Sequence, residues 1–294
     1  MEIKCLQVKD SNIYFESVSP FVHDYYMYLI TILQFILTGS KPVNILVGNF
    51  DLPLENQIRI GINYEHTLVR KGGRDTEGSP EGKIPDGSDR YLVRIDGYQN
   101  LMRAGISIDY SMPNIVNIQS SGLYDEFSKK LIYLPPFLYP LVTDKKERPI
   151  PTLTTFLNTE EPRRKRLLQK LKNHKNVNNC FDKDQLQGLY LETKILINIH
   201  QTDYHHTFEE LRVLPALLCG CIVICEDSPL KETIPYSNFV IWSTYDSIYE
   251  TIKEVQNNYS VIWNNIFGPE SKIHDIYQHQ IASIQHLKSK IDSI

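Results

Sequence analysis

A run of basic residues at the start of a predicted helix is suited to binding an anion. The segment NTEEPRRKR follows a predicted strand, Thr152–Leu157, and Pro162 is typical of the first turn of a helix. Arg163 and Arg164 then lie near a helix N-terminus, where cations oppose the helix dipole unless an anion binds between them. A diphosphate is such an anion. A solvated basic face accounts for these residues equally well, whereas a nucleic-acid patch is disfavoured because no aromatic residues alternate with the charges.

A second polar segment, HQTDYHHT, follows the apolar strand predicted at Ile195–Ile199. Thr207 and Glu210 have the spacing of a capping box at the start of the next helix. A capping box explains Glu210 but leaves Glu209 and Arg212 unexplained, so these two residues are candidates for ligand binding. Zinc binding by the histidines of this segment is disfavoured, because two of them are adjacent and none are spaced along one helix face.

Acidic and histidine side chains also follow strands in the first half of the chain. The strand predicted at Gln57–Tyr64 runs into a glycine-rich segment that returns to the same edge of the sheet. We predict that a general base, able to take a proton from a hydroxyl group, lies among three residues there. These three are Glu65, His66 and Asp75. Asp51 and Asp96 follow other predicted strands, but a turn before Pro53 and a helix N-cap explain them more simply.

Hydrophobic patterning predicts an alternation of strands and helices that would position these residues. In the first half it predicts strands at Ile3–Val8, Val43–Phe50, Gln57–Tyr64, Tyr91–Ile95 and Ile106–Tyr110, and helices at Pro20–Thr38 and Tyr98–Ala104. The segment Arg70–Arg90 interrupts this order with five glycines and two prolines. We expect it to form a long mobile loop, either a lid or a surface insertion.

After a proline-rich linker at Leu134–Pro140 the same alternation resumes. It predicts strands at Thr152–Leu157, Val177–Phe181, Ile195–Ile199, Cys221–Cys225 and Phe239–Trp242, with helices at Pro162–Lys172, Gln185–Leu191 and Phe208–Cys219. The predicted fold class is α/β, with two Rossmann-like domains facing each other across a cleft. The expected boundaries are an N-terminal domain at 1–140, a C-terminal domain at 141–262, and a helical tail at 263–294 that could pack back on the first domain.

Composition limits the class of protein. The chain has 294 residues, 41% hydrophobic, and a net charge of -4, which argues against disorder and disfavours a nucleic-acid-binding protein. Five scattered cysteines do not suggest a disulfide framework, so a reducing compartment is expected. The most apolar stretch, Tyr25–Thr38, is shorter than the roughly 20 residues that span a bilayer, and we expect a buried helix begun by Ser19 and Pro20. No secretory signal is visible at the N-terminus, so a cytoplasmic location is expected.

The block Lys194–Tyr236 resembles the nucleotide-sugar domain of GT-B glycosyltransferases, including exostosin-like and small viral members. An apolar strand and a polar loop lead into a helix whose family positions are occupied here by Glu209, Glu210, Arg212, Ala216, Leu217 and Gly220. The resemblance implies that an acidic residue holds the nucleotide ribose, and that helix N-termini and basic side chains bind the diphosphate. Many retaining members carry Glu-x7-Glu, but Thr207 and Pro215 stand at those positions here, which favours an inverting transferase.

The resemblance further implies a hexosyl- or pentosyltransferase with a UDP- or GDP-linked sugar donor and an oligosaccharide or glycoconjugate acceptor. Its donor-binding residues would be Arg163, Arg164, His200, Tyr204, Thr207, Glu209, Glu210 and Arg212. No cofactor, metal, nucleic acid or membrane span is expected. The Asp182-Lys-Asp184 sequence has the Asp-x-Asp form of metal-dependent transferases, but Asp184 is simply explained as a helix N-cap.

The protein would be a monomer or a homodimer. Two alternatives stay open from the sequence: a nucleotide-sugar epimerase or hydrolase on the same scaffold, and a non-catalytic nucleotide-sugar-binding module.

Overall fold

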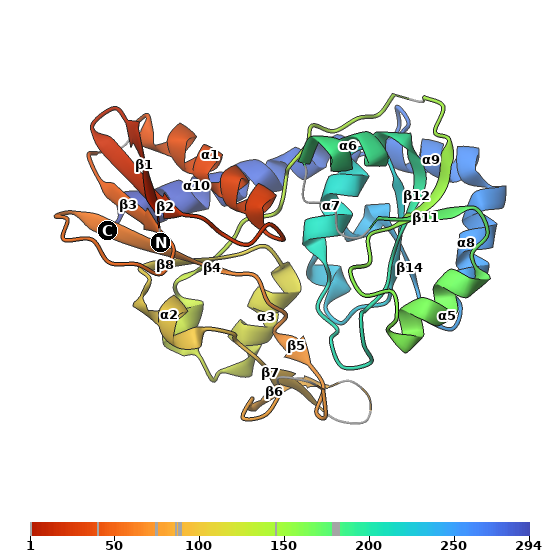
Figure 1. Ribbon diagram of the computed structural model, residues 1–294, viewed down its shortest axis with the longest axis horizontal. Helices are drawn as coiled ribbons and strands as arrows, with labels where there is room; N and C mark the ends of the chain where they lie inside the picture. The colour runs from red at the N-terminus through yellow and green to blue at the C-terminus, as the bar shows by residue number, and fades with distance from the viewer. Residues whose placement is uncertain are drawn as a thin grey trace.

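The computed structural model describes residues 2–39, 41–73, 76–85, 87, 90–144, 146–177 and 183–294, with the backbone alone at 183 and 184. Asp75, a predicted base, lies outside the described residues, as do Cys180, Asp182 and the side chain of Asp184. The described chain forms two larger sheets that lie side by side and a small third sheet below them in the view of Figure 1.

The first sheet has six strands, of which only the edge strand β1 runs antiparallel to its neighbour. In spatial order the strands are β1 (Ile3–Val8), β2 (Ser11–Glu16), β3 (Asn44–Val47), β4 (Gln57–Asn63), β8 (Ile106–Asp109) and β9 (Leu131–Tyr133). Its helices are α1 (His23–Leu37), α2 (Tyr98–Arg103), α3 (Met112–Ser121) and α4 (Asp125–Ser128). Figure 1 shows α1 on one side of this sheet, with α2 and α3 on the other. Strands covered on both faces need apolar side chains in succession, as β3 has.

The second sheet is wholly parallel, in the order β11 (His174–Asn176), β10 (Ile150–Thr154), β12 (Thr193–Asn198), β13 (Ile222–Glu226) and β14 (Val240–Ser243). Its helices are α5 (Pro162–Lys170), α6 (Lys183–Glu192), α7 (Glu210–Leu218), α8 (Ile248–Asn257) and α9 (Tyr259–Phe267), with 3-10 turns at Lys231–Thr233, Ser237–Phe239 and Ile273–Asp275. In chain order this is the doubly wound arrangement 2-1-3-4-5. The predicted α/β class with parallel sheets is therefore confirmed.

Each larger sheet has a hydrophobic core of its own. The last helix, α10 (Ile276–Asp292), runs from the second sheet back to the first and lies beside α1 (Figure 1). Leu287 and Ile291 of α10 are buried in the first core, and Gln280 donates a hydrogen bond to the Tyr28 hydroxyl at 3.2 Å. The chain thus crosses between the two cores twice.

The apolar stretch at 25–38 forms a core helix, as predicted. Eight of the 15 residues of α1 are buried. Among the described residues, no helix combines the length and the apolarity needed to cross a bilayer.

The prediction of a long mobile loop at Arg70–Arg90 was wrong. Strand β6 (Glu81–Pro85) lies within it and pairs antiparallel with β7 (Arg90–Val93), which pairs in turn with β5 (Leu68–Val69). This small sheet is separate from the first sheet, although a main-sheet strand had been expected at Tyr91–Ile95. The glycines misled the prediction. A Cβ at Gly82 would meet the Tyr91 carbonyl oxygen at 3.1 Å, so that glycine permits close strand pairing rather than mobility.

Several predicted helix starts were also wrong. Helix α1 begins at His23, after Val22, rather than at Ser19 and Pro20. Helix α2 follows Gly97, whose positive φ of 61° makes it the N-cap in place of Asp96. Of the strand expected at Val177–Phe181, residues 178–181 lie outside the described residues, and β11 precedes it. Strand β2 and helix α3 were missed: β2 follows β1 through a tight turn, and α3 carries buried asparagines in place of a continuous apolar face.

Candidate functional site

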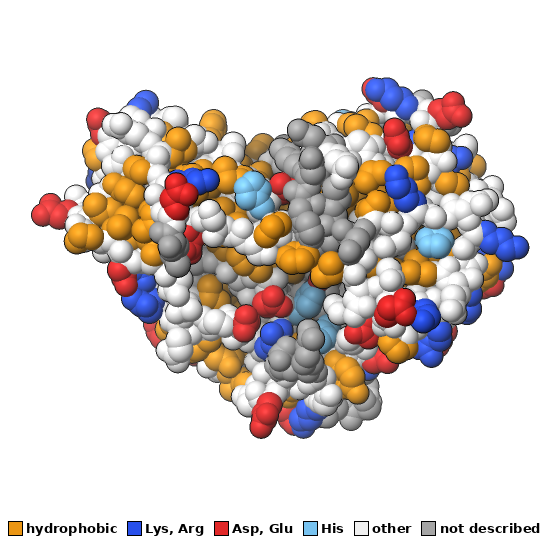
Figure 2. All heavy atoms as spheres, in the orientation of Figure 1, with side chains coloured by type: hydrophobic (Ala, Val, Ile, Leu, Met, Phe, Trp, Pro, Cys, Tyr) orange, Lys and Arg blue, Asp and Glu red, His pale blue; other side chains and the backbone are white. Residues whose placement is uncertain are grey.

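The doubly wound sheet has a natural ligand site where its winding direction changes, between β10 and β12. The loops that follow these two strands diverge there, and ligands in such sheets bind in the resulting crevice. One loop, 155–161, leads into α5, and the other, 199–209, leads into α7. The residues predicted to bind the donor come from these loops and the first turns of these helices. Figure 2 shows histidine side chains at the centre of one face, between the two halves of the molecule, with acidic and basic side chains beside them.

Arg163, in the first turn of α5, is buried in a network of acceptors. Its guanidinium forms a bidentate ion pair with Glu226 at the end of β13, with N···O distances of 2.6 and 2.8 Å. Asp203 lies 2.6 Å from Nε, and the guanidinium stacks over the Tyr245 ring at 4.2 Å. Arg163 was predicted to bind a diphosphate, but its charge is already matched by carboxylates.

Arg164, the next residue, is only 3% exposed and has no such match. Its guanidinium lies over the Phe156 ring at 4.5 Å, and its buried Nε has no hydrogen-bond partner among the described residues. None of the described carboxylates forms an ion pair with it. Burial and the nearby Arg212 guanidinium lower the pKa of Arg164 to about 10. No side chain caps the N-terminus of α5, so the helix adds positive potential there. The carboxylates of Glu209 and Glu161 act on this charge only from beyond ion-pair distance.

Glu209 joins the two halves of the molecule. One of its oxygens lies 2.6 Å from Nε2 of His66, which follows β4, and the other lies 3.2 Å from Nη1 of Arg212. Burial opposes ionisation of Glu209, but its contacts with the His66 imidazole and the Arg212 guanidinium outweigh burial and hold its pKa well below the usual range. A predicted catalytic residue and a predicted ribose-binding residue are thus in direct contact.

The loop between β12 and α7 is bound along its length by the small sheet. The Arg70 amide donates to the Tyr204 carbonyl at 2.8 Å, and the His206 amide donates to the Leu68 carbonyl at 3.1 Å. His205 forms an antiparallel bridge with Val69. These bonds form an isolated antiparallel bridge between the loop and β5, an edge strand of the small sheet.

The predicted capping box was wrong. Helix α7 begins at Glu210 without a side-chain cap. Thr207 instead accepts a hydrogen bond from the Leu68 amide at 3.1 Å and donates one to Asn114 at 3.1 Å, both in the other half of the molecule. Thr207 thus makes tertiary hydrogen bonds in place of the expected helix-capping bond.

Glu210 is fully buried and bound entirely by protein groups. It accepts hydrogen bonds from the Met112 amide and from the hydroxyls of Tyr133 and Tyr236, at 2.9, 2.6 and 2.7 Å. Burial raises its pKa to about 7. Asp109, at the end of β8, is equally buried among amide donors, and burial raises its pKa to about 7 as well. Glu210 therefore joins the two halves structurally and is not exposed to a donor.

The remaining predicted residues surround this centre. His200 is buried, with its ring centre 4.7 Å from that of His206, and burial lowers its pKa far enough to keep it neutral. Tyr204 is exposed and its ring covers Gly73. Glu65 is exposed, with Arg94 at 3.7 Å. Asp51 is paired with two arginines on the surface, Arg59 and Arg103, so it has a structural partner rather than a free carboxylate.

Sequence reasoning missed Glu226 and Asp109, two acids that end apolar strands. The same signal, an acid directly after four or more strand residues, had drawn attention to Asp51 and Asp96. Among the described residues there is no group of three histidine, cysteine, aspartate or glutamate side chains placed to hold a metal ion. Cys219, Cys221 and Cys225 are buried and unpaired.

Comparison with known proteins places this architecture beside a glycosyltransferase. No family model matches the chain. It is 29% identical over 211 residues to uncharacterized protein R358 of Acanthamoeba polyphaga mimivirus, covering 66% of this chain and 72% of that protein. A crystal structure of a mutant of TarM from S. aureus, in complex with Fondaparinux, alpha-GlcNAc-glycerol and UDP, superposes with a TM-score of 0.52 at 12% identity.

That superposition covers 92% of this chain, which spans 58% of the TarM chain. TarM is a GT-B glycosyltransferase, and the likeness shows that the two proteins share this fold.

Proposed function

We propose that the protein is a glycosyltransferase that moves a sugar from a nucleoside diphosphate donor to a sugar acceptor. The observation that carries the proposal is the unmatched positive charge of Arg164. It is buried at a helix N-terminus, near Arg212, on the side of the sheet where doubly wound sheets bind ligands. A diphosphate would supply the missing anion. The GT-B fold supports a sugar nucleotide as its source.

The proposed donor site differs from the sequence-based one in three residues, Arg163, Glu209 and Glu210. Arg164 and Arg212 bind the diphosphate, with Thr207, Tyr204 and His200 in the surrounding loop. Arg163 positions that loop through Glu226 and Asp203, and Glu210 holds the two halves together. The two sheets then correspond to the acceptor and donor sides of a cleft.

His66 is the proposed general base. Its Nε2 binds the ionised Glu209, so Nε2 carries the proton and Nδ1 is left with a free lone pair. Nδ1 has no hydrogen-bond partner among the described residues. Glu209 is thus a positioning residue that fixes the tautomer, as the acid of a Ser-His-Asp triad does.

The proposed reaction is a single displacement with inversion. His66 Nδ1 takes the proton from an acceptor hydroxyl as its oxygen bonds to the anomeric carbon of the donor. The bond between that carbon and the diphosphate oxygen breaks, and both electrons leave with the nucleoside diphosphate. Arg164 and Arg212 neutralise the charge that develops on this leaving group, a role that needs no metal ion.

Calorimetric titration of nucleoside diphosphates tests the donor site. We expect UDP or GDP to bind, and Arg164→Met to weaken binding ten- to a hundredfold. Arg166→Met is the matched control: it removes the same charge from an exposed position of α5 and should change affinity less than threefold. Equal losses in both variants would mean that only the general charge of α5 attracts the anion.

Turnover of the sugar nucleotide then separates a transferase from a binding module. His66→Ala should lower turnover on the order of a hundredfold while nucleotide affinity stays within threefold. Turnover should persist in EDTA. A wild-type protein that binds nucleotide yet never hydrolyses or transfers the sugar would support the non-catalytic alternative.

A further inference from the structure

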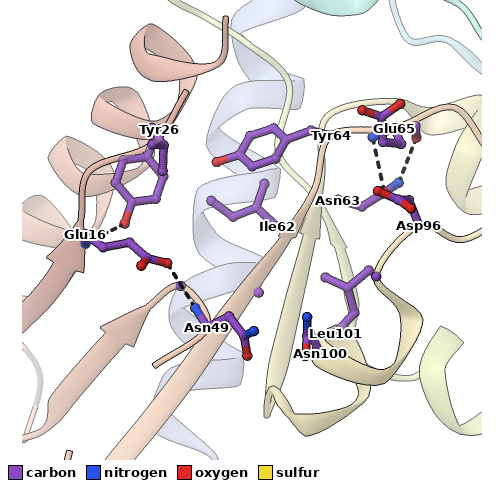
Figure 3. Close-up of a pocket in the computed structure, with 14 residues that line it drawn as sticks. Glu16, Tyr26, Asn49, Ile62, Asn63, Tyr64, Glu65, Asp96, Asn100 and Leu101 are labelled. Atoms are coloured by element: carbon purple, nitrogen blue, oxygen red, sulfur yellow. Dashed lines mark hydrogen bonds between the residues drawn. The ribbon is translucent and has the colours of Figure 1, made fainter. Parts of the chain in front are cut away.

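A cavity of about 290 Å³ opens at the carboxyl ends of β2, β3 and β4, on the first sheet. Its size is at the lower end of small-molecule sites, which run from about 300 to 1,000 Å³. Figure 3 shows its polar lining, which includes Glu16, Asn49, Asn63, Tyr64, Glu65 and Asp96. None of the described residues that line it is a lysine or an arginine.

The Glu16 wall of this cavity is a built structure. Glu16 ends β2, and its carboxylate accepts a hydrogen bond from the Asn49 amide at 3.2 Å. A Cβ at Gly48 would meet that carboxylate at 2.5 Å, and Gly48 has a positive φ of 131°, so only glycine fits there. Tyr26 completes the wall by donating its hydroxyl proton to the Val47 carbonyl at 2.8 Å. The carboxylate is therefore fixed at the strand end.

The opposite side of the cavity carries an unsatisfied polar group. The hydroxyl of Tyr64 is buried and has no hydrogen-bond partner among the described residues. In Figure 3 the Tyr64 ring extends across the cavity toward Tyr26. A buried hydroxyl without a partner is destabilising, and a ligand hydroxyl that reached it would remove that cost.

We infer that this cavity holds the terminal sugar of the acceptor, and that this sugar is uncharged or carries a free amine but no phosphate, sulfate or carboxylate. This inference rests on the proposed function and names the substrate class of its acceptor side. Glu65 and Asn63 of the cavity precede His66 by one and three residues in the chain, so the cavity and the proposed base share the segment that ends β4, although His66 is not among the lining residues.

The charge of the lining selects this class. Carboxylates only accept hydrogen bonds, and sugar hydroxyls and ammonium groups donate them. Glu16, Glu65 and Asp96 would repel an anionic sugar, and Arg94 reaches Glu65 only at 3.7 Å without lining the cavity. The side-chain amides of Asn49 and Asn100 suit the hydroxyls of a neutral sugar, whereas that of Asn63 is already bonded to Glu65 and Asp109. The donor side, with its buried arginines, has the opposite preference.

A glycan array probed in the presence of UDP tests the inference. We expect neutral and amine-bearing glycans to bind at least tenfold better than matched uronic-acid or phosphorylated ones. Glu16→Gln combined with Asp96→Asn should reduce this discrimination to less than threefold, and Asn100→Lys should raise binding of acidic glycans. Glu126→Gln, an exposed carboxylate on α4, is the control and should leave the profile unchanged.

The outcomes separate this inference from the proposed function. UDP affinity and thermal melting of each variant establish that its fold and donor site are intact. A wild-type profile led by acidic glycans, or a preference that survives the double substitution, contradicts the inference while leaving donor binding in place. A wild-type protein that binds no nucleoside diphosphate contradicts the proposed function instead.

Discussion

Arg148 and Arg164 are both arginines that are 3% exposed. They lie at opposite ends of the strands of the second sheet. Arg148 donates hydrogen bonds to the carbonyls of Tyr190, Thr193 and Cys219, at 3.0, 3.0 and 2.7 Å. These carbonyls end α6 and α7, where the helix dipoles are negative. Arg164 lies at the positive end of α5, and none of its nitrogens bonds to a described residue, whereas Arg148 lacks an acceptor for its Nε alone.

The difference shows how burial alone fails to distinguish a structural cation from a binding one. At the amino ends of the strands, carbonyl groups of helix C-termini accept the hydrogen bonds of an arginine. At the carboxyl ends of the strands, helix N-termini offer no free carbonyl groups, so an arginine there needs either a carboxylate or a ligand. Arg163 has the carboxylate of Glu226, and Arg164 is the residue that we propose to bind the ligand.

The largest effect we expect is that of Arg148→Met on stability. Three buried carbonyls would lose their donor, and the free energy of unfolding should fall by about 3 kcal/mol or more. Urea denaturation measures this, with Arg166→Met as the control for loss of one charge. Nucleotide affinity of the folded protein should not change. If Arg148→Met unfolded at the same urea concentration as the wild type, Arg148 would not be a structural cation and the comparison would fail.

An intermediate effect on stability should come from the buried acids. Unlike an arginine, a buried acid can lose its charge by taking up a proton. Glu210 has a pKa raised to about 7, so the folded state holds its proton between about pH 4 and 7 while the unfolded chain does not. The resulting stability is fully present below about pH 4 and is lost as the pH rises through 7.

The free energy of unfolding should therefore fall from pH 5 to pH 8, and Glu210→Gln should reduce that fall on the order of 2 kcal/mol. Urea denaturation at several pH values measures it. Asp109 contributes in the same direction, so some slope remains in the variant. A wild-type stability that rises over this range would show that Glu210 is ionised in the folded protein.

The smallest effect should be that of Arg164→Met in the ligand-free protein. Removing a buried charge without a partner should leave the unfolding free energy unchanged or raise it by about 1 kcal/mol. The same variant should lose most of the thermal stabilisation that a nucleoside diphosphate gives the wild type. If Arg164→Met destabilises the protein as much as Arg148→Met, Arg164 has a structural acceptor and the comparison fails.

Local patterns predicted the elements but not the contacts between them. Strand and helix periodicity located most of the parallel strands, and Pro162 correctly indicated that Arg163 and Arg164 lie in a first helical turn. The pairing of Arg163 with Glu226 could not be predicted, because it depends on which strand lies next to β12.

Contacts between the two halves of the molecule were even harder to predict from the sequence. The contact of His66 with Glu209 joins residues far apart in sequence, so no spacing rule applies to it. Thr207 shows that a local motif can also give a wrong prediction. Its sequence context is that of a helix cap, yet Asn114 and Leu68 of the other half supply its partners.

The strand-type bonds between residues 68–70 and 204–206 constrain how the molecule moves. Main-chain bonds of this kind hold at a fixed spacing and break together, so the two larger sheets cannot separate at this point without breaking this bridge. Any change in their relative orientation must leave this seam in place and act as a rotation about it. The crevice would then widen most at the rim farthest from the seam, and products would depart from that rim.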